Sequence, residues 1–264
     1  MIDRPEILLG ARLFAAATRS GTRLHGLPEG AAPRDLDEAY AIQDAGNRLL
    51  DARIAGYKIG LTTASAQRAF RAAAPIAGRL GKQAIRRSPA VVVPTAEHLR
   101  IVEAEVVFEI GTDLSPADAP FTDDTIIGAV GNAYAGLEVC NSRLFNGDEL
   151  GLLHLVADNC NADLLIIGDR LDGWSAAGLR SLPVTLERSR AAPVVGSTAA
   201  VLGNPLSAVA WLANWLAKRG EPLTRGQLIA SGSCTGLTEL ADGDVAVATF
   251  GTLGRVEARF RAPA

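Results

Sequence analysis

The stretch RIVEAEVVFEIG, residues 100–111, predicts a buried β-strand, yet it carries three carboxylates. Side chains alternate between the two faces of a strand. The even positions form one apolar face, made of Ala104, Val106, Phe108 and Ile110. The odd positions form the other face, made of Glu103, Glu105, Val107 and Glu109. Two interpretations follow: a strand with one solvated face, or a strand that carries part of a polar site.

The spacing of these carboxylates decides which of them can act together. Residues two apart on a strand lie roughly 6.6–7 Å apart at Cα, so the Glu103 and Glu105 side chains can converge on one divalent cation. Glu109 lies about 13 Å from Glu105 by the same rise, and we expect it to be a replaceable surface residue. Mg²⁺ and Mn²⁺ prefer carboxylate oxygens, but two carboxylates make an incomplete site. A third acidic ligand is therefore expected elsewhere in the chain.

Glu138 and Lys58 are the candidates for completing this site. Glu138 lies between two apolar residues in AGLEVCNSR, residues 135–143. It is either an outward-facing residue of an edge strand or the third ligand. Lys58 lies in GYKIGLT, residues 56–62, and is either an exposed lysine or a partly buried one that titrates near neutrality.

The composition limits the classes of function that the chain can serve. The 264 residues carry a net charge of -3, with 48% hydrophobic and 21% charged residues, which is typical of a globular protein. A protein that binds nucleic acid or a membrane surface needs a basic face, whereas Lys and Arg are scattered here. No apolar run is long enough to span a membrane, and the N-terminus lacks the basic segment of a signal peptide. Three cysteines without paired spacing, Cys140, Cys160 and Cys234, favour reduced thiols in a cytoplasmic protein.

Helical and strand patterns divide the chain unevenly. Residues 1–85 are mainly helical, and residues 86–264 are rich in strand patterns. We therefore expect one catalytic domain of the α+β class, in which a helical N-terminal region precedes a β-rich metal-binding body. Residues 122–136 are ambiguous and favour a helix.

Two helices have clear end signals. Residues 35–56 predict a helix with Asp35 as the N-cap. Residues 204–220 predict the clearest helix of the chain, with Asn204 as the N-cap, Pro205 at the first position and Gly220 just past the end.

Five motifs together resemble the 2-keto-4-pentenoate hydratase/4-oxalocrotonate decarboxylase family of the fumarylacetoacetate hydrolase superfamily. They are GYKIGLT (56–62), VEAEVVFEIG (102–111), GLEVCNSR (136–143), VADN (156–159) and GNPLSAVAWLANWLAKRGEPLTRGQLIASGS (203–233). The resemblance covers roughly residues 35–260. It implies a fumarylacetoacetate-hydrolase-like mixed β-roll with helices packed around it. It also implies a homo-oligomer, and a complex with another enzyme of the same pathway.

The resemblance further implies a metal-dependent lyase. The site for Mg²⁺ or Mn²⁺ would be made of Glu103, Glu105 and Glu138, with Lys58 as the catalytic residue beside the substrate. The implied substrate is a 2-keto or 2-hydroxydienoic acid from the meta-cleavage degradation of aromatic compounds. A divalent ion acts as a Lewis acid toward such an acid and stabilises an enolate, which hydration and decarboxylation have in common. Lys58 would stabilise that charge or move protons.

The resemblance also indicates residues that contact the substrate. Asp158 and Asn159 of VADN would line the pocket, although an Asx turn explains them equally well. Ser231 and Ser233 of SGSCTG, residues 231–236, would offer backbone N–H groups and a hydroxyl to the substrate carboxylate, or would only form a turn.

Two segments bear on the choice of reaction. Hydratases of the family carry Asp in a PDxG segment, whereas this chain has Ile76 in APIAGRL, residues 74–80, as the decarboxylases do. SGSCTG is closer to the hydratase pattern SGSxT, and VADNCNADLLIIG departs from the ADNASSG of both. We therefore expect a hydratase of a 2-hydroxypenta-2,4-dienoate-type substrate ahead of a 4-oxalocrotonate-type decarboxylase, with Ile76 near the substrate.

Two further functions stay open at this point. A C–C hydrolase of an acylpyruvate needs a general base for water, and the region before Lys58 offers only His25 with Glu29 or Glu38. A non-catalytic partner subunit would keep the fold without the site. The intact acidic residues and Lys58 argue against it, because costly buried charges are the first to be lost from an idle site.

Overall fold

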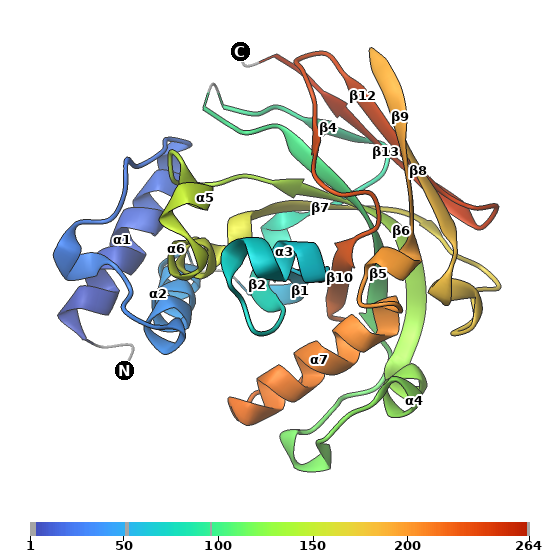
Figure 1. Cartoon of the computed structure of the whole chain (residues 1–264), viewed down its shortest axis with the longest axis horizontal. Coiled ribbons are helices and arrows are strands. Elements are labelled where there is room, and N and C mark those ends of the chain that lie inside the picture. The colour runs from blue at the N-terminus through green and yellow to red at the C-terminus, as the bar shows by residue number, and fades with distance from the viewer. Residues whose placement is uncertain (1–3, 51–52, 96, 263–264) are drawn as a thin grey trace.

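The computed structural model describes residues 4–50, 53–95 and 97–262. Two β-sheets pack against each other, one group of helices covers an end of the larger sheet, and a long helix runs along its side (Figure 1). The helices are α1 (Pro5–Ser20), α2 (Leu36–Leu49), α3 (Ala64–Phe70), α4 (Asp123–Ile126), α5 (Gly147–Leu150), α6 (Leu152–Ala157) and α7 (Pro205–Lys218). None of the described helices is long and apolar enough to cross a bilayer.

The larger sheet is built around the stretch that carries the three carboxylates. Its strands follow the order β2 (Ile76–Gly81), β1 (Ile54–Gly60), β10 (Leu228–Ser233), β5 (Ile101–Ile110), β6 (Val130–Cys140), β7 (Ala162–Arg170) and β3 (Ile85–Arg87), and β11 (Thr238–Glu239) also pairs with β5. β5 and β6 pair antiparallel over nearly their full length. The apolar even face of β5 is buried as predicted.

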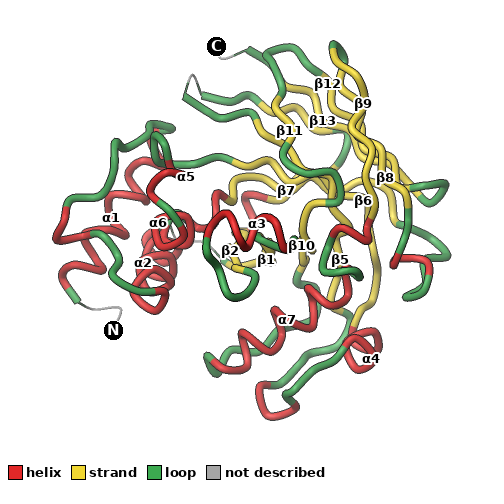
Figure 2. The backbone as a smooth tube through the Cα atoms, viewed as in Figure 1, coloured by secondary structure: helices red, strands yellow, loops and turns green. Residues whose placement is uncertain are grey.

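The smaller sheet covers that apolar face. Its order is β4 (Ala90–Val92), β13 (Gly254–Phe260), β12 (Val245–Phe250), β8 (Pro183–Arg188) and β9 (Ala191–Ser197). Val106, Phe108, Val256 and Phe250 belong to one hydrophobic core that spans both sheets and includes α7. Figure 2 shows the strands of this second sheet gathered at one end of the molecule, away from the helices.

The two helices with clear end signals form as the sequence predicts. The Asp35 side chain accepts a hydrogen bond from the Glu38 N–H and so caps α2, and Asn204 accepts one from the Leu206 N–H at the start of α7. Gly220 follows α7 with φ of 71°. Helix α2 is shorter than the helix predicted over residues 35–56, since it ends at Leu49. Residues 51–52 of that range lie outside the described part of the chain.

Two parts of the chain differ from their predicted form. Only the first half of residues 122–136 is helical, and β6 begins at Val130, because Ala133 and Ala135 alternate into the core opposite β5. Within the first 85 residues, β1 and β2 join the larger sheet. β1 pairs parallel with β10, which lies about 170 residues later in the chain. No local pattern predicts the pairing of a strand with a partner so remote in sequence.

A close approach between the two sheets yields a test of this packing. A Cβ atom at Gly168 of β7 would lie 2.3 Å from the Arg255 carbonyl oxygen of β13. Because the obstacle is backbone, Gly168→Ala should lower the free energy of unfolding by about 1–3 kcal/mol, as overpacked sites do. Gly128→Ala is the control, since a Cβ there meets nothing within 4 Å. Urea denaturation of both variants measures the difference, and equal stabilities would contradict the close packing of β7 on β13.

Candidate active site

The carboxylates of β5 and β6 meet on the face of the larger sheet opposite the core. Glu103 of β5 pairs directly with Glu138 of β6, and Glu105 pairs with Gly136. This face is not solvated, because Glu105 is 1% exposed, Glu138 is 0% exposed and Glu103 is half-buried. The sheet therefore places the three predicted ligand residues in one largely buried cluster. Among the described residues, the donor atoms that lie within 4.8 Å of one another belong to Glu103, Glu138 and Cys140, and Glu105 lies outside this closer group.

Lys58 reaches this cluster from β1, with β10 and β5 between it and β6. Its Nζ lies 3.0 Å from Glu138 Oε1 and donates a hydrogen bond of 2.9 Å to the Cys160 carbonyl oxygen. The residue is 5% exposed, which excludes the alternative of an exposed lysine. An ammonium held by one carboxylate and one carbonyl has a fixed position at the edge of the cluster.

A bulge in β10 orients the carboxylate of Glu105. The pairing of β10 with β5 shifts between Ala230 and Ser233, which leaves Ser231 and Gly232 opposite a single residue of β5. The Gly232 N–H then donates to Glu105 Oε2 at 2.8 Å, and the Ser231 hydroxyl donates to the Val106 carbonyl oxygen. Gly232 has φ of 118°, which only glycine adopts readily. The bulge therefore aims a backbone donor at Glu105.

Burial and like charge dominate the electrostatics of the cluster. Burial raises the pKa of Glu105 well above its ordinary value, and the carboxylates of Glu138 and Glu103 add to the shift. Burial also raises the pKa of Glu138, although Lys58 opposes the shift. With three carboxylates ionised and one lysine charged, the cluster carries a net charge of about -2, which a divalent cation neutralises.

The charge state of Lys58 differs from the one expected. Burial disfavours its charged form, but the carboxylates of Glu138 and Glu103 outweigh burial and raise the pKa of Lys58 well above its ordinary value. The raised pKa favours the protonated lysine beside these carboxylates, in contrast to the expectation of a lysine that titrates near neutrality. The sequence showed that Lys58 was flanked by apolar residues, but not that its side chain faces an acidic cluster.

Glu109 lies apart from the cluster, as its distance from Glu105 predicted, but it is not a free surface residue. It is half-buried, and its Oε2 accepts hydrogen bonds of 2.8 Å from Asn132 Nδ2 and Tyr134 Oη. Both donors come from β6, on the same face of the sheet. Glu109 thus joins β5 to β6 at a distance from Lys58.

A turn after α6 carries the predicted VADN residues. Asp158 is buried and binds Arg143 and Ser142. The Asn159 amide holds both backbone groups of Arg79 on β2, with N–O distances of 2.8 and 2.9 Å. Both residues line a cavity of about 200 Å³, and the described residues that line it do not include Lys58 or the three carboxylates. Their contact with a substrate stays a prediction.

Three successive residues of this turn have left-handed backbones. The φ angles of Asn159, Cys160 and Asn161 are 52°, 55° and 58°. Each such residue other than glycine costs about 1–2 kcal/mol. The two hydrogen bonds from Asn159 to Arg79 help to offset this cost, and the turn presents the Cys160 carbonyl oxygen to Lys58.

Ser233 and Ile76, the other two predicted substrate-binding residues, lie next to the cluster residues Glu105 and Lys58. Ser233 pairs with Glu105 across the β10–β5 ladder, and its hydroxyl accepts from the Gly236 N–H. Ile76 pairs with Gly60 of β1 and is buried among apolar side chains of the helical region. A Cβ atom at Gly60 would lie 3.2 Å from Ile76 Cγ1 and 3.9 Å from Lys58 Nζ, so Ile76 and Lys58 are neighbours across Gly60.

Known proteins share this fold and much of this sequence. The TodF product hydratase of Pseudomonas putida F1 is 30% identical over 95% of this chain and 93% of its own. The 4-oxalocrotonate decarboxylase of Pseudomonas putida is 30% identical over 98% of both chains. The chain belongs to the 2-keto-4-pentenoate hydratase/4-oxalocrotonate decarboxylase family. No protein-family model matches it.

Solved structures agree with this family and with the predicted fold. The 4-oxalocrotonate decarboxylase from Pseudomonas putida G7, solved with magnesium and adipate, superposes with a TM-score of 0.87 at 28% identity over 98% of this chain and 99% of its own. The 2-hydroxyhepta-2,4-diene-1,7-dioate isomerase from Mycobacterium marinum, at 15% identity over 80% of this chain and 77% of its own, has a TM-score of 0.61 and shares the fold. The predicted α+β fold of the fumarylacetoacetate hydrolase superfamily is confirmed. As a family member, the chain is an enzyme of the hydratase and decarboxylase type.

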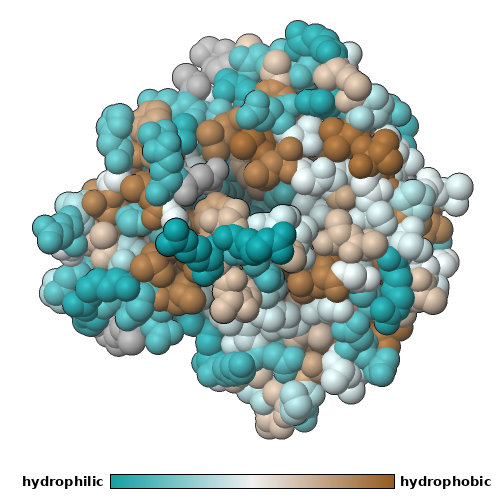
Figure 3. Space-filling model, viewed as in Figure 1, coloured by the Kyte–Doolittle hydropathy of each residue, from teal (hydrophilic) through white to brown (hydrophobic). Residues whose placement is uncertain are grey.

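The acidic cluster of this chain has features that fit a divalent cation. Among the described residues, neither Glu138 oxygen receives a hydrogen bond of good geometry, although Lys58 Nζ lies close to one of them. Buried carboxylate oxygens without donors are costly, and a cation removes that cost. Figure 3 shows a hollow above the polar side chains of α3, with apolar side chains gathered on its rim.

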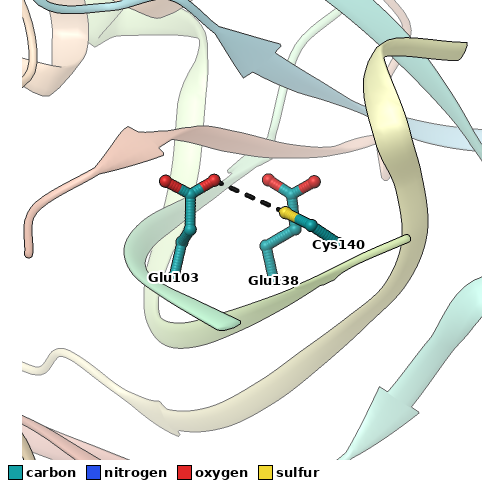
Figure 4. Close-up of side chains that lie close together, drawn as sticks. All are labelled: Glu103, Glu138 and Cys140. Atoms are coloured by element: carbon teal, nitrogen blue, oxygen red, sulfur yellow. Dashed lines mark hydrogen bonds between the residues drawn. The ribbon is translucent and has the colours of Figure 1, made fainter. Parts of the chain in front are cut away.

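Cys140 is a member of the cluster that sequence reasoning missed. One donor atom each of Glu103, Glu138 and Cys140 lie within 4.8 Å of one another, and the thiol lies 3.5 Å from Glu103 Oε2 (Figure 4). The signal was present, since Cys140 is two residues after Glu138 and so shares its face of the strand. It was overlooked because a lone cysteine is usually a small buried hydrophobic residue.

The Asn159 turn leads to a stability prediction for this family member. Asn159→Ala removes both hydrogen bonds to Arg79, and we expect the free energy of unfolding to fall by about 2 kcal/mol. Asn159→Gly removes the same bonds but relieves the left-handed strain, so its loss should be about 1 kcal/mol smaller. Guanidinium denaturation compares the variants. Wild-type stability in both would show that the amide does not hold the turn.

Proposed function

We propose that the protein is a divalent-metal-dependent lyase of a 2-keto or 2-hydroxydienoic acid. Its leading reaction is the hydration of a 2-hydroxypenta-2,4-dienoate-type substrate in the meta-cleavage degradation of aromatic compounds. The observation that carries this proposal is the buried cluster of Glu103, Glu105 and Glu138 with Lys58 at its edge. Such a group of carboxylates is unfavourable by itself and suits a cation. The magnesium-bound decarboxylase relative supports the same assignment.

Each residue of the cluster has a separate task. The three carboxylates hold the ion, and the bulge donor from Gly232 orients Glu105. When bound, the ion supplies Lewis-acid stabilisation of negative charge on the 2-keto acid. Lys58 keeps its ammonium directed at the cluster through the Cys160 carbonyl oxygen, so it can stabilise an oxyanion or deliver a proton to the substrate.

One observation favours a second reaction of the same class. Ile76 lies across Gly60 from Lys58, where the hydratases of the family carry an Asp that can act on water. An apolar side chain offers no general base, which suits the loss of CO₂ from a 4-oxalocrotonate-type substrate. Hydration remains ahead because the SGSCTG loop has the hydratase pattern, whereas the 30% identity to this chain is the same for the hydratase and the decarboxylase relatives.

An acylpyruvate hydrolase and a non-catalytic subunit have weaker support. Hydrogen bonds from Arg34 and Arg4 lower the pKa of Glu38 to about 2. Glu38 is therefore an ion-pair partner of these arginines and poorly suited to act with His25 as the general base of a hydrolase. The ring of His25 stacks on Phe145 at 4.7 Å. Both observations disfavour the hydrolase. A non-catalytic subunit would not need the charged cluster.

The setting of the enzyme is part of the same proposal. We infer Mg²⁺ or Mn²⁺ as the native ion, a cytoplasmic location, and a homo-oligomer that associates with another enzyme of its pathway. The three cysteines are buried and unpaired, which suits a reducing compartment. The oligomer and the pathway complex rest on the family resemblance alone. Light scattering of the purified protein, alone and mixed with a pathway enzyme, tests both.

A substrate panel tests the proposed reaction. The protein with Mg²⁺ or Mn²⁺ is incubated with 2-hydroxypenta-2,4-dienoate, with 2-oxohex-3-enedioate and with an acylpyruvate. Ultraviolet loss of the first substrate without CO₂ release supports the hydratase. Release of CO₂ from the second supports the decarboxylase. Cleavage of the acylpyruvate alone would overturn the lyase proposal.

The role of Lys58 leads to a kinetic prediction. Lys58→Ala should lower kcat by about 10²–10⁴-fold, the usual contribution of a positioned proton-transfer group. The metal content should be unchanged, because the carboxylates hold the ion. Lys82→Ala is the matched control, since Lys82 is exposed. Full activity of Lys58→Ala would refute the catalytic role.

The three carboxylates lead to a prediction about metal content. Glu105→Gln should lose most of its Mg²⁺ or Mn²⁺, measured by mass spectrometry of the purified protein after dialysis. Glu109→Gln, on the same face of β5 but outside the cluster, should retain the metal. An equal metal content in wild type and Glu105→Gln would rule out Glu105 as a ligand.

A further inference from the structure

The thiol of Cys140 introduces a soft donor into a site otherwise made of hard oxygens. Cys140 is 4% exposed and belongs to the end of β6, two residues beyond Glu138. Figure 4 shows the three side chains of Glu103, Glu138 and Cys140 grouped together, with the sulfur next to a Glu103 oxygen. Nothing in the proposed reaction requires a sulfur atom at this place.

One distance in this group, the hydrogen bond from the Cys140 thiol to Glu103, is close to the sulfur–oxygen separation expected around a four-coordinate ion. Bonds of about 2.3 Å to sulfur and about 2.1 Å to a carboxylate oxygen, at a tetrahedral angle, separate the two donors by about 3.6 Å. The Cys140 Sγ to Glu103 Oε2 distance is 3.5 Å. The third donor, a Glu138 oxygen, also lies within 4.8 Å of both. An ion between the three atoms therefore needs only small side-chain adjustments.

Glu138 supplies an independent sign that a ligand belongs here. Its side chain is 0% exposed, and neither oxygen receives a hydrogen bond of good geometry within the described part of the chain. Its ion-pair partner, Lys58, lies on the side of β1, whereas Cys140 lies further along its own strand. A buried carboxylate of this kind, aimed between an acidic and a sulfur donor, is suited to a cation.

We propose that Cys140 is a metal ligand and raises the affinity of the site for thiophilic divalent ions, such as Co²⁺, Fe²⁺ or Zn²⁺, relative to its affinity for Mg²⁺. This inference rests on the proposed function, because it uses the same ion site. On binding, the S–H bond breaks, a bond between sulfur and the metal forms, and the proton passes to solvent. Thiolate sulfur favours softer ions and adds little affinity for Mg²⁺, which prefers oxygen ligands.

Cobalt provides a direct spectroscopic test. The full chain, freed of metal with a chelator, is titrated with Co²⁺, and the near-ultraviolet spectrum is recorded. A sulfur-to-cobalt charge-transfer band is expected in wild type. Cys140→Ser should bind Co²⁺ without this band. Cys234→Ser is the matched control, because Cys234 is also buried but lies outside the group of three donors, and it should keep the band.

Competition between ions gives a second readout. The ratio of Co²⁺ to Mg²⁺ affinity should fall by at least about tenfold in Cys140→Ser, since even an outer-shell partner contributes about that much. Cys140→Asp replaces sulfur with a hard donor, so it should bind Mg²⁺ and show no band. It therefore keeps the test informative if the serine variant folds poorly.

The outcomes separate this inference from the proposed function. Co²⁺ binding to wild type without the band, a band that persists in Cys140→Ser, or an unchanged affinity ratio would each overturn sulfur ligation and leave the carboxylate site standing. Failure of wild type to bind Co²⁺, Mg²⁺ or Mn²⁺ would overturn both.

Discussion

The direct opposition of Glu103 and Glu138 across the β5–β6 ladder is the constraint on which the site depends. Like charges placed opposite each other destabilise a sheet, and burial increases the cost. Lys58 offsets only part of it, because one ammonium group faces three carboxyl groups. Such an arrangement persists when a cation belongs to the folded state. The acidic pair therefore links the stability of the sheet to its chemistry.

The surrounding elements hold these charges in fixed positions. β1 pairs parallel with β10 and so brings Lys58 to the acidic face. The bulge of β10 gives Glu105 a backbone donor, while the Ser231 hydroxyl satisfies the carbonyl oxygen that the bulge leaves unpaired. The left-handed turn at Cys160 completes the environment of Lys58 at a cost in backbone strain. Strain of this kind persists only where the surrounding contacts determine the geometry.

Local sequence patterns predicted part of this arrangement. Alternation within residues 100–111 was enough to place Glu103 and Glu105 on one face and to separate Glu109 by distance. End signals predicted α2 and α7 because capping depends on neighbouring residues. Glu138 and Lys58 entered as isolated candidates, and only the ordered motifs of the family connected them. The parallel pairing of β1 with β10 and the protonated state of Lys58 depend on contacts between residues far apart in the chain. The half-buried state of Glu109 likewise follows from Asn132 and Tyr134 on the next strand.

In the proposed function, the carboxylates that bind the cation lie on other strands than Ile76, the residue proposed to distinguish hydration from decarboxylation. The carboxylates belong to β5 and β6 inside the larger sheet, where many ladder bonds fix the backbone. Ile76 belongs to β2, at the edge of the same sheet, and reaches the neighbourhood of Lys58 only across Gly60. An enolate needs the same stabilisation whether water is added or CO₂ is lost. A substitution on β2 can therefore change the fate of the intermediate without disturbing the charges that stabilise it. This separation gives a physical reason why one acidic cluster serves both hydratases and decarboxylases.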